Sequence, residues 1–455
     1  MPKIGLNEIL KVTGAEVNFA GEKIFEDIVT DSRKISDGVL FVALKGENFN
    51  GENFAKDAIE KGAAGVVVGK NCSPENLPVE GIVFKVDDTL TAYQQIAGLH
   101  RDKFKIPVVG ITGSNGKTTT KDLTAAALSG LGKIQKTAAN FNNEIGVPLT
   151  LLGIEENCRA AVVEIGMRGR GQIESLAEFV KPNIGIVTTV NETHIEILGS
   201  LENIARAKAE MVEAIPSGGI VILNIDNPHI RDMKKYAAPG VKILTYALEN
   251  PADFVAENIS VGNTSTKFTL NCGGEKIDFE IPLLGRHNAS NALAAIAAGK
   301  SLGLSFEEIQ AGFKNLAVSK MRFEVSEKDG LTIINDAYNA GPASMAASIK
   351  TVAEVYKGRK IAVLGDMLEL GDFAEKLHRE VGREVAENNF DILITLGELG
   401  KFIAEGAKDS GLKNIFTTAD HDAAAKKILE VAEKGDTILF KASHGMHMEK
   451  IIEKI

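Results

Sequence analysis

The segment Gly110-Ile-Thr-Gly-Ser-Asn-Gly-Lys-Thr-Thr-Thr120 is the most informative stretch of this chain. An apolar, β-branched run at residues 106–111 predicts a strand before it, and residues 122–131 predict a helix after it. A glycine-rich turn between a strand and a helix points backbone N–H groups and the helix N-terminus at an anion. The segment therefore predicts a phosphate-binding loop.

Individual residues of this loop suit different parts of a nucleotide. Lys117 provides a positive charge for the β- and γ-phosphates, and the Thr118 hydroxyl is a suitable Mg²⁺ ligand. The usual G-x4-G-K-[ST] spacing would place a glycine where this chain has Ile111, so the loop departs from the common pattern. The alternative is a glycine-rich turn that only happens to precede Lys-Thr. The expected nucleotide contacts in this segment are Gly113, Ser114, Asn115, Gly116, Lys117, Thr118 and Thr119.

Composition limits the class of protein. A chain of 455 residues suggests about three domains of roughly 150 residues each. The 51 basic and 61 acidic residues give a net charge of −10, which argues against a nucleic-acid surface or a polybasic membrane anchor. The 3 cysteines are far apart without C-x-x-C spacing, as expected in a reducing cytosol and without a zinc site. No leader pattern and no apolar stretch of about 18 residues is found, so we expect a cytoplasmic protein without stable membrane insertion. We also expect a monomer.

Apolar patterning predicts an α/β protein of three domains. We place an N-terminal domain at residues 1–86, a central P-loop domain at 87–317 and a C-terminal Rossmann-like domain at 318–455. The expected strands of the first domain are 39–43, 65–68 and 82–86, with a helix at 52–61 and a connecting helix at 87–105.

The two larger domains differ in pattern. Short, nearly continuous apolar runs predict a parallel central sheet covered on both faces, and the alternation across residues 259–281 predicts a small antiparallel meander. The expected central strands are 108–112, 160–164, 184–190, 220–224 and 241–246, and a helix is expected at 288–299. The last domain is expected to be doubly wound, with strands at 331–335, 360–364, 392–396 and 437–441 and helices at 342–357, 373–388 and 421–433.

Open α/β sheets bind ligands beyond the carboxyl ends of their strands. Glu164 ends such a strand and is placed like the acid that holds the nucleotide Mg²⁺, although a strand-end carboxylate can also cap the next turn. His194 follows the strand at 184–190 by four residues, where a loop histidine is either a ligand or an ordinary surface imidazole.

Lys208 has an unusual position in the helix expected at 202–215. It lies four residues from both Ile204 and Val212, on the apolar stripe, whereas Arg206 and Glu210 are expected on the solvent face. The lysine either extends its ammonium to water from the edge of the stripe or is a desolvated amine that takes up CO₂ as a carbamate. Periodicity alone leaves both readings open.

These motifs together resemble the Mur ligases, ATP-dependent ligases of peptidoglycan synthesis, over essentially the whole chain. Thr112-Gly-Ser-Asn-Gly-Lys-Thr-Thr119 resembles the family loop T-G-[TS]-N-G-K-T-T and accounts for the departure at position 111. Residues 140–148 resemble the following N-x-N-N-x-x-G-x-P segment, which implies that Asn142 and Asn143 bind substrate. Residues 285–293 resemble the adenine site G-x-H-N-x-x-N-A-L, which implies base contacts from Asn288 and Asn291.

The resemblance also implies the metal site. Glu164 and His194 fall on the family's Mg²⁺ ligands, and Ala207-Lys-Ala-Glu210 resembles the stretch whose lysine is carbamylated. Two Mg²⁺ ions are implied, the first held by Thr118 and Glu164, the second by His194 and carbamylated Lys208.

In the last domain, Arg322, Asp336 and Tyr338 match positions that close over the nucleotide. Gly365-Asp-Met-Leu-Glu-Leu-Gly371, with His378 downstream, resembles the signature of the branch that adds D-alanyl-D-alanine. In the first domain, Ser32 and Arg33 resemble the element that meets the UDP end of the substrate. The chain departs from the family pattern at four positions near these segments: Glu52, Gly341, Ala343 and His444.

The implied substrates are UDP-N-acetylmuramoyl-tripeptide, D-Ala-D-Ala and ATP, joined through an acyl phosphate. Lys117, Glu164, His194 and Lys208 are the implied catalytic residues. Two other classes stay open: a folylpolyglutamate synthase, which shares the P-loop but lacks the signature at residues 365–371, and a regulatory P-loop NTPase, which needs no carboxylate acceptor.

Overall fold

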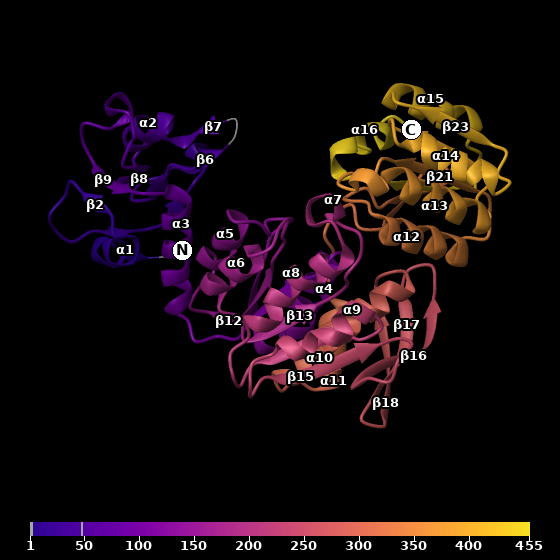
Figure 1. Ribbon diagram of the computed structural model, residues 1–455, viewed down its shortest axis with the longest axis horizontal. Coiled ribbons are helices and arrows are strands. Elements are labelled where there is room, and N and C mark those ends of the chain that lie inside the picture. The colour runs from indigo at the N-terminus through magenta and orange to yellow at the C-terminus, as the bar shows by residue number, and fades with distance from the viewer. Residues whose placement is uncertain (1–2, 47–48) are drawn as a thin grey trace.

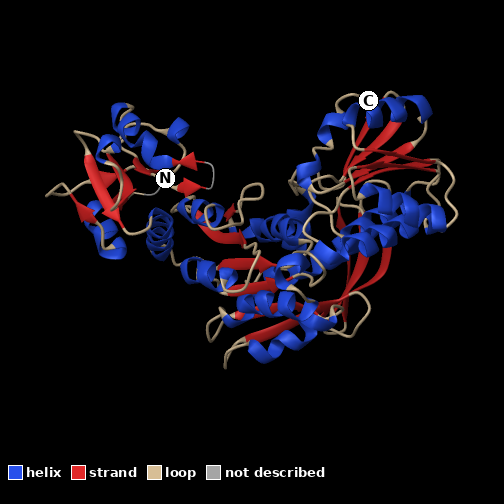
Figure 2. Ribbon diagram, turned by 45° about the horizontal axis from the view of Figure 1, so that its top comes forward, coloured by secondary structure: helices blue, strands red, loops and turns tan. Residues whose placement is uncertain are grey.

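The structure is a computed structural model that describes residues 3–46 and 49–455. The chain is α/β, with three domains that each contain a β-sheet and follow one another along the colour bar of Figure 1. The N-terminal and C-terminal domains stand on opposite sides of the central domain in both ribbon views (Figures 1 and 2). The expected fold class is confirmed.

The N-terminal domain has a five-stranded sheet of order β2-β9-β8-β5-β4. All its neighbouring strands are parallel except the edge strand β2, which pairs antiparallel with β9. Successive residues of the central strands are buried on both faces, which explains their continuous apolar sequence. The strands are β2 (Glu16–Val17), β4 (Ile28–Val29), β5 (Leu40–Val42), β8 (Gly65–Gly69) and β9 (Ile82–Val86). Smaller elements are β1 (Ile4–Gly5), α1 (Leu6–Thr13), β3 (Ile24–Phe25), β6 (Lys45–Gly46), β7 (Phe49–Asn50) and α2 (Ala55–Glu60).

The helix α3 (Thr89–Asp102) leads from this domain and is anchored on the central one. His100 Nε2 lies 2.9 Å from the Ile154 carbonyl oxygen, and Arg101 Nε donates to the Val180 carbonyl oxygen at 3.1 Å.

The central domain has a nine-stranded sheet of order β11-β12-β10-β13-β14-β15-β16-β17-β18. Its strands are parallel from β11 to β16, and β16, β17 and β18 form the expected antiparallel meander. The strands are β10 (Val108–Thr112), β11 (Lys133–Lys136), β12 (Cys158–Glu164), β13 (Ile184–Val187), β14 (Ile220–Asn224), β15 (Lys242–Ala247), β16 (Phe254–Val261), β17 (Thr266–Cys272) and β18 (Glu275–Ile281). The helices include α4 (Lys117–Ala127), α5 (Gly146–Leu152), α6 (Gln172–Val180), α7 (Ile195–Leu198), α8 (Leu201–Glu213), α9 (Pro228–Arg231), α10 (Arg286–Ser301) and α11 (Phe306–Lys314).

The C-terminal domain has a six-stranded sheet of order β19-β20-β24-β21-β22-β23. Its strands are parallel except the edge strand β19. Helices α12, α13 and α14 cover one face, while α15 and α16 cover the other, so the domain is doubly wound as expected. The elements are β19 (Glu324–Lys328), β20 (Leu331–Asn335), α12 (Pro342–Val355), β21 (Lys360–Gly365), α13 (Ala374–Glu387), β22 (Ile392–Leu396), α14 (Gly400–Asp409), β23 (Ile415–Thr418), α15 (His421–Val431), β24 (Thr437–Lys441) and α16 (Glu449–Ile452).

The main differences from expectation are at element ends and sheet edges. The helix expected at 122–131 begins at Lys117 and ends at Ala127, with a 3₁₀ turn from Leu128 to Leu131. The strand expected at 184–190 ends at Val187. Edge strands such as β11, β19 and β23 were not expected, because half-buried or exposed edge strands lack the long apolar runs of central strands. Across the part of the chain that the structure describes, no helix is long and apolar enough to cross a bilayer.

Candidate functional site

A cleft of about 1510 Å³ lies where the carboxyl ends of the central parallel strands meet the C-terminal domain. The P-loop lines it from the central domain, and residues of α12, β24 and the loop after β21 line it from the C-terminal domain. The cleft therefore contains most of the expected site residues: Ser114, Asn115, Gly116, Lys117, Thr118, Thr119, Asn142, Asn143, Glu164, His194, Asn288, Asn291, Arg322, Asp336 and Tyr338.

The backbone of the P-loop requires glycine at two places. Gly113 has φ +150° and lies so close to Thr188 that a Cβ atom would overlap its hydroxyl. Gly116, the residue before α4, has φ +81°, and a Cβ atom there would lie 2.6 Å from Asn291 Oδ1. These glycines let the loop turn tightly and open the N-terminus of α4 towards the cleft, as anion binding requires.

Lys117 folds back over the loop. Its Nζ donates to the carbonyl oxygens of Gly113 at 2.8 Å and Ser114 at 3.3 Å. Burial lowers the pKa of Lys117, and the nearby Glu164 carboxylate opposes that effect. A half-buried ammonium that bonds only to carbonyl groups gains strongly from an arriving phosphate.

The hydroxyl of Thr118 is held by the C-terminal domain. Arg322 Nη2 donates to Thr118 Oγ1 at 3.0 Å, and the Arg322 guanidinium stacks over the Tyr338 ring at 3.8 Å. This contact places three of the expected nucleotide residues together, although they come from segments far apart in sequence.

Glu164 ends β12 beneath the P-loop. Its Oε1 accepts a hydrogen bond of 2.7 Å from Asn142 Nδ2, whereas Oε2 is buried and has no hydrogen-bond partner among the described residues. A buried carboxylate oxygen without a donor is costly in a finished structure. It suits a cation that arrives with the nucleotide.

Lys208 is only 2% exposed, and no described residue forms a hydrogen bond or ion pair with its amine. Burial and the like charge of Lys117 lower the pKa of Lys208 well below its ordinary value. A lysine that extends to water keeps its ammonium solvated, which this burial does not allow. The geometry supports the desolvated amine.

Another residue of α8 differs from expectation. Glu210 was placed on the solvent face, yet it is 5% exposed. Its carboxylate accepts hydrogen bonds from the backbone N–H groups of Gly171 at 2.7 Å and Glu174 at 3.2 Å. Glu210 therefore caps the N-terminus of α6, a tertiary role that the helical period does not reveal.

His194 contacts the loop at residues 365–371. Its Nδ1 lies 2.5 Å from Glu369 Oε2, and this pairing is the main cause that lowers the pKa of the Glu369 carboxyl. The glutamate belongs to the segment that carries the D-alanyl-D-alanine branch signature. The signature at residues 365–371 includes Glu369, but the motif alone did not identify it as a site residue.

The two asparagines of α10 join that helix to α4. Asn291 Nδ2 donates to Asn288 Oδ1 at 3.0 Å, and Asn291 Oδ1 accepts from Thr120 Oγ1 at 3.2 Å. Asn288 Nδ2 donates to the Leu284 carbonyl oxygen at 2.8 Å. Both amides are buried at the wall of the cleft, beside the P-loop.

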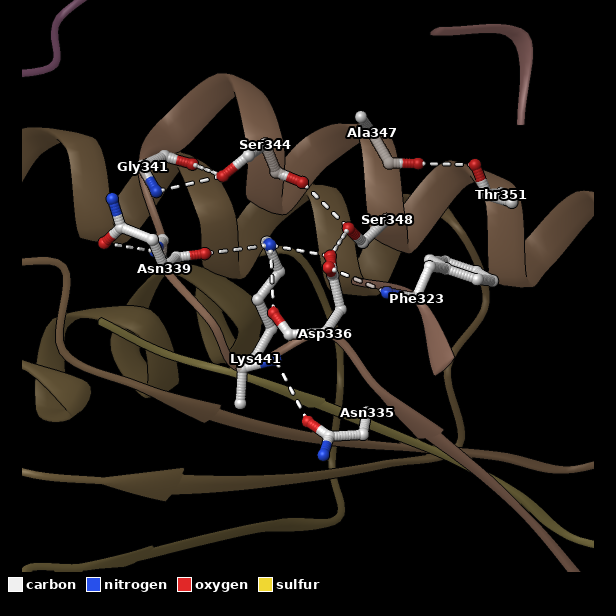
Figure 3. A network of polar contacts seen from close by, with 12 residues as sticks. Phe323, Asn335, Asp336, Asn339, Gly341, Ser344, Ala347, Ser348, Thr351 and Lys441 are labelled. Atoms are coloured by element: carbon white, nitrogen blue, oxygen red, sulfur yellow. Dashed lines mark hydrogen bonds and ion pairs between the residues drawn. The ribbon is translucent and has the colours of Figure 1, made fainter. Parts of the chain in front are cut away.

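Asp336 is the centre of a polar network in the C-terminal domain (Figure 3). Lys441 Nζ lies 2.6 Å from Asp336 Oδ2, which also accepts from Ser348 Oγ at 2.5 Å. The Phe323 N–H donates to Asp336 Oδ1 at 3.1 Å. Lys441 was not identified in advance, although it ends a predicted strand, the same signal that identified Glu164.

Two of the expected substrate residues, Arg33 and Asn143, have other partners in this structure, and Ser32 lies outside the cleft. Arg33 lies outside the cleft with its side chain 87% exposed, and it pairs with Asp31 through two hydrogen bonds of 2.9 and 2.8 Å. Ser32 belongs to the same short 3₁₀ turn and also lies outside the cleft. Asn143 Oδ1 accepts from the Gly146 N–H at 2.9 Å and so holds the first turn of α5.

The donor set fits a metal only in part. Within residues 3–46 and 49–455, no group of three or more His, Cys, Asp or Glu residues could hold a metal ion by itself. The unpaired oxygen of Glu164 and the threonine hydroxyl suit Mg²⁺ when nucleotide phosphates complete the site. Lys208 fits only as a carbamate, because an ammonium repels a cation.

Comparison with known proteins agrees with this arrangement. Three family models match: "Mur ligase family, catalytic domain" at residues 25–101, "Mur ligase middle domain" at 111–299, and "Mur ligase, glutamate ligase domain" at 321–444. The UDP-N-acetylmuramoyl-tripeptide–D-alanyl-D-alanine ligase of Bacillus subtilis is 40% identical over 451 residues, which cover 98% of this chain and 96% of that protein. The Escherichia coli enzyme of the same name is 34% identical, covering 100% of this chain and 99% of that protein.

Solved structures show the same similarity. The crystal structure of MurF from Acinetobacter baumannii has a TM-score of 0.91 and 28% identity, covering 100% of this chain and 99% of that one. The MurF ligase of Thermotoga maritima, solved in complex with ADP, has a TM-score of 0.84 and 26% identity, covering 94% of this chain and 96% of that one. The chain belongs to the Mur ligase family.

Proposed function

We propose that this Mur ligase joins D-Ala-D-Ala to the tripeptide carboxylate of UDP-N-acetylmuramoyl-tripeptide and uses ATP to do so. The observation that carries the proposal is one cleft that holds a P-loop and a buried carboxylate oxygen of Glu164 without a hydrogen-bond partner. The buried Lys208 lies outside the residues that line the cleft, near enough to Lys117 for the like charge to lower its pKa. The full-length similarity to enzymes with that name supports the choice of substrates.

The reaction proceeds in two displacements. A carboxylate oxygen of the tripeptide attacks the γ-phosphorus of ATP, the bond to the β-phosphate oxygen breaks, and ADP leaves. The amine of D-Ala-D-Ala then attacks the acyl phosphate carbon, an amide bond forms with loss of a proton, and inorganic phosphate leaves. Phosphoryl transfer depends mainly on positioning and charge neutralisation, which the half-buried Lys117 and the N-terminus of α4 provide.

Two Mg²⁺ ions would supply charge neutralisation at the phosphates and the attacking carboxylate. Thr118 and Glu164 would hold one ion, while His194 and carbamylated Lys208 would hold the other. The lowered pKa of Lys208 supports the carbamate. Its neutral amine attacks CO₂, a nitrogen–carbon bond forms, and loss of a proton leaves an anion.

The remaining roles are binding roles. We assign the P-loop from Gly113 to Thr119 to the phosphates and Asn288 and Asn291 to the adenine. Arg322, Asp336 and Tyr338 would close over the nucleotide from the C-terminal domain. Asn142 and Asn143 would meet the acceptor substrate, and Ser32 and Arg33 would meet its UDP end. A nucleotide-linked glycopeptide is a long substrate, and binding sites on all three domains suit its length.

We place the domain boundaries at residues 1–86, 87–317 and 318–455. The anchoring of α3 on the central domain supports the first boundary. Ser319 supports the second, because its N–H and hydroxyl both donate to Asp122 Oδ2 on α4, at 3.2 and 2.7 Å. We also propose that the protein acts in the cytoplasm as a monomer.

Phosphate release tests the function. Purified protein with ATP and Mg²⁺ should release little phosphate alone, and rapid release should require both UDP-N-acetylmuramoyl-tripeptide and D-Ala-D-Ala. ATP hydrolysis that neither compound changes would favour a regulatory NTPase. Release that responds to a folate and glutamate would favour the folylpolyglutamate synthase class. Parallel assays with tripeptides ending in diaminopimelate or lysine would show which one this enzyme uses.

A further inference from the structure

The contact between His194 and Glu369 joins two domains. His194 comes directly before α7 of the central domain, whereas Glu369 belongs to the loop that follows β21 of the C-terminal domain. Their side chains approach to 2.5 Å between Nδ1 and Oε2. Apart from this contact, the buried Nδ1 has no hydrogen-bond partner among the described residues.

The backbone on both sides of this contact is unusual. His194 has φ +66° and Glu369 has φ +64°, and neither residue is glycine. Such conformations cost free energy and persist where the surrounding structure fixes them. Here the Glu196 N–H donates to the Glu369 carbonyl oxygen at 3.4 Å, and Gly371 packs against the Glu196 side chain. The two residues are therefore held face to face by main chain as well as by side chain.

The contact determines which ring nitrogen of His194 is available. With Nδ1 facing Glu369, Nε2 is the other ring nitrogen, and no hydrogen bond joins it to a described residue. His194 lines the cleft, so Nε2 is the ring nitrogen left for a ligand there. A carboxylate behind a metal-bound imidazole fixes its tautomer and orientation and raises its basicity.

We propose that Glu369 is a positioning residue for His194, and that it makes the second metal site of the central domain depend on a docked C-terminal domain. The inference rests on the proposed role of His194 as a metal ligand. Metal binding at His194 and docking of the C-terminal domain on the central domain then favour each other. Coupling between two equilibria is reciprocal, so an ion bound to His194 strengthens docking by the same factor by which docking strengthens ion binding.

Mn²⁺ binding tests the proposal without turnover. The purified full-length protein is titrated with Mn²⁺ in the presence of bicarbonate and a non-hydrolysable ATP analogue. Electron spin-echo spectroscopy then detects the nitrogen of an imidazole bound to the ion. Glu369→Ala should weaken the nitrogen-coupled site by about 10- to 100-fold. Glu369→Gln keeps the size of the side chain and an acceptor oxygen, so its loss should be smaller.

Glu196→Gln is the matched control, because it removes a carboxylate at the same joint that has no described contact with His194. It should leave the nitrogen-coupled site unchanged. The double variant His194→Ala/Glu369→Ala should bind Mn²⁺ no more weakly than His194→Ala alone, since Glu369 acts through the imidazole.

The outcomes separate the inference from the proposed function. If the nitrogen coupling is present, disappears in His194→Ala and keeps its full affinity in both Glu369 variants, the positioning role is wrong and the metal site stands. If the wild-type protein shows no nitrogen-coupled Mn²⁺, the role of His194 as a ligand is wrong and the inference is overturned with it.

Discussion

Arg322 and Thr118 are joined by a hydrogen bond of 3.0 Å that connects the segment before β19 to the first turn of α4. The guanidinium that makes this bond lies over the Tyr338 ring, 3.8 Å from its centroid. A cation from the C-terminal domain is thus already present where the γ-phosphate and its metal would arrive. The bond also satisfies the threonine hydroxyl until a nucleotide replaces it.

Replacing Arg322 with alanine should lower kcat/KM for ATP by about 10- to 100-fold, which corresponds to roughly 1.4–2.7 kcal/mol of transition-state stabilisation. Arg322→Lys should recover little, because lysine lacks the planar fork that stacks on Tyr338. Arg206→Ala is the control. Arg206 also lies over a tyrosine ring, 4.9 Å from the centroid of Tyr236, but this pair does not line the cleft. Steady-state kinetics with all three substrates measures the effect. Unchanged kinetics in Arg322→Ala would contradict the assignment.

If Lys208 is the proposed carbamate ligand, Lys208→Ala should nearly abolish ligation while the fold and ATP binding persist, because the variant would lose a metal ligand rather than a stabilising contact. Formate or acetate should restore part of the rate by filling the position of the carbamate. Lys208→Arg should not be rescued, because the guanidinium keeps its charge and takes up no CO₂. Ligation rates with and without added carboxylate measure this. A fully active Lys208→Ala enzyme would exclude the carbamate.

His287 should make stability depend on pH. Burial lowers the pKa of His287 to about 4, whereas its ordinary value is 6.5. Between these values the unfolded chain binds a proton that the folded chain does not, so stability is fully present above pH 6.5 and falls as the pH drops towards 4. The loss should be on the order of 1–3 kcal/mol. Denaturation midpoints at pH 7 and pH 4.5 should differ less in His287→Gln than in the wild type, and His229→Gln should behave like the wild type.

Nucleotide and substrate together should compact the molecule. The N-terminal and C-terminal domains stand apart in this structure (Figures 1 and 2), yet the proposed substrate contacts lie on all three domains. Closure would exclude water from the acyl phosphate. Small-angle scattering should show a smaller radius of gyration with an ATP analogue plus UDP-N-acetylmuramoyl-tripeptide. An unchanged scattering curve would count against closure.

The sequence predicted the sheets better than their edges. Buried parallel strands such as β14 and β22 have the predicted bounds, because continuous apolar runs are distinctive. Edge strands such as β11 and β23 pair on one side and are only half buried, so little in their composition separates them from loops.

For the site, local motifs predicted which residues meet in the cleft, but not what each one touches. Glu164 and Lys208 were identified from position and period, and both are buried, but only Glu164 lines the cleft. Glu210 was placed on the wrong face of its helix, and Glu369 was not identified as a site residue. The partners of both residues belong to other elements, so no local spacing in the sequence encodes these contacts. Tertiary partners of this kind follow from the packing of domains, which one sequence does not reveal.

The most direct test of the acyl-phosphate mechanism is the transfer of one carboxylate oxygen of the tripeptide to the released phosphate. The enzyme is incubated with ATP, D-Ala-D-Ala and UDP-N-acetylmuramoyl-tripeptide that carries ¹⁸O in its terminal carboxylate. Mass spectrometry then measures the masses of the ligation product and of the released phosphate. Ligation through an acyl phosphate should give a UDP-linked pentapeptide and one ¹⁸O in each phosphate released, because the attacking carboxylate oxygen stays on phosphorus. Phosphate without the label, or ATP consumption without the pentapeptide, would contradict ligation through an acyl phosphate.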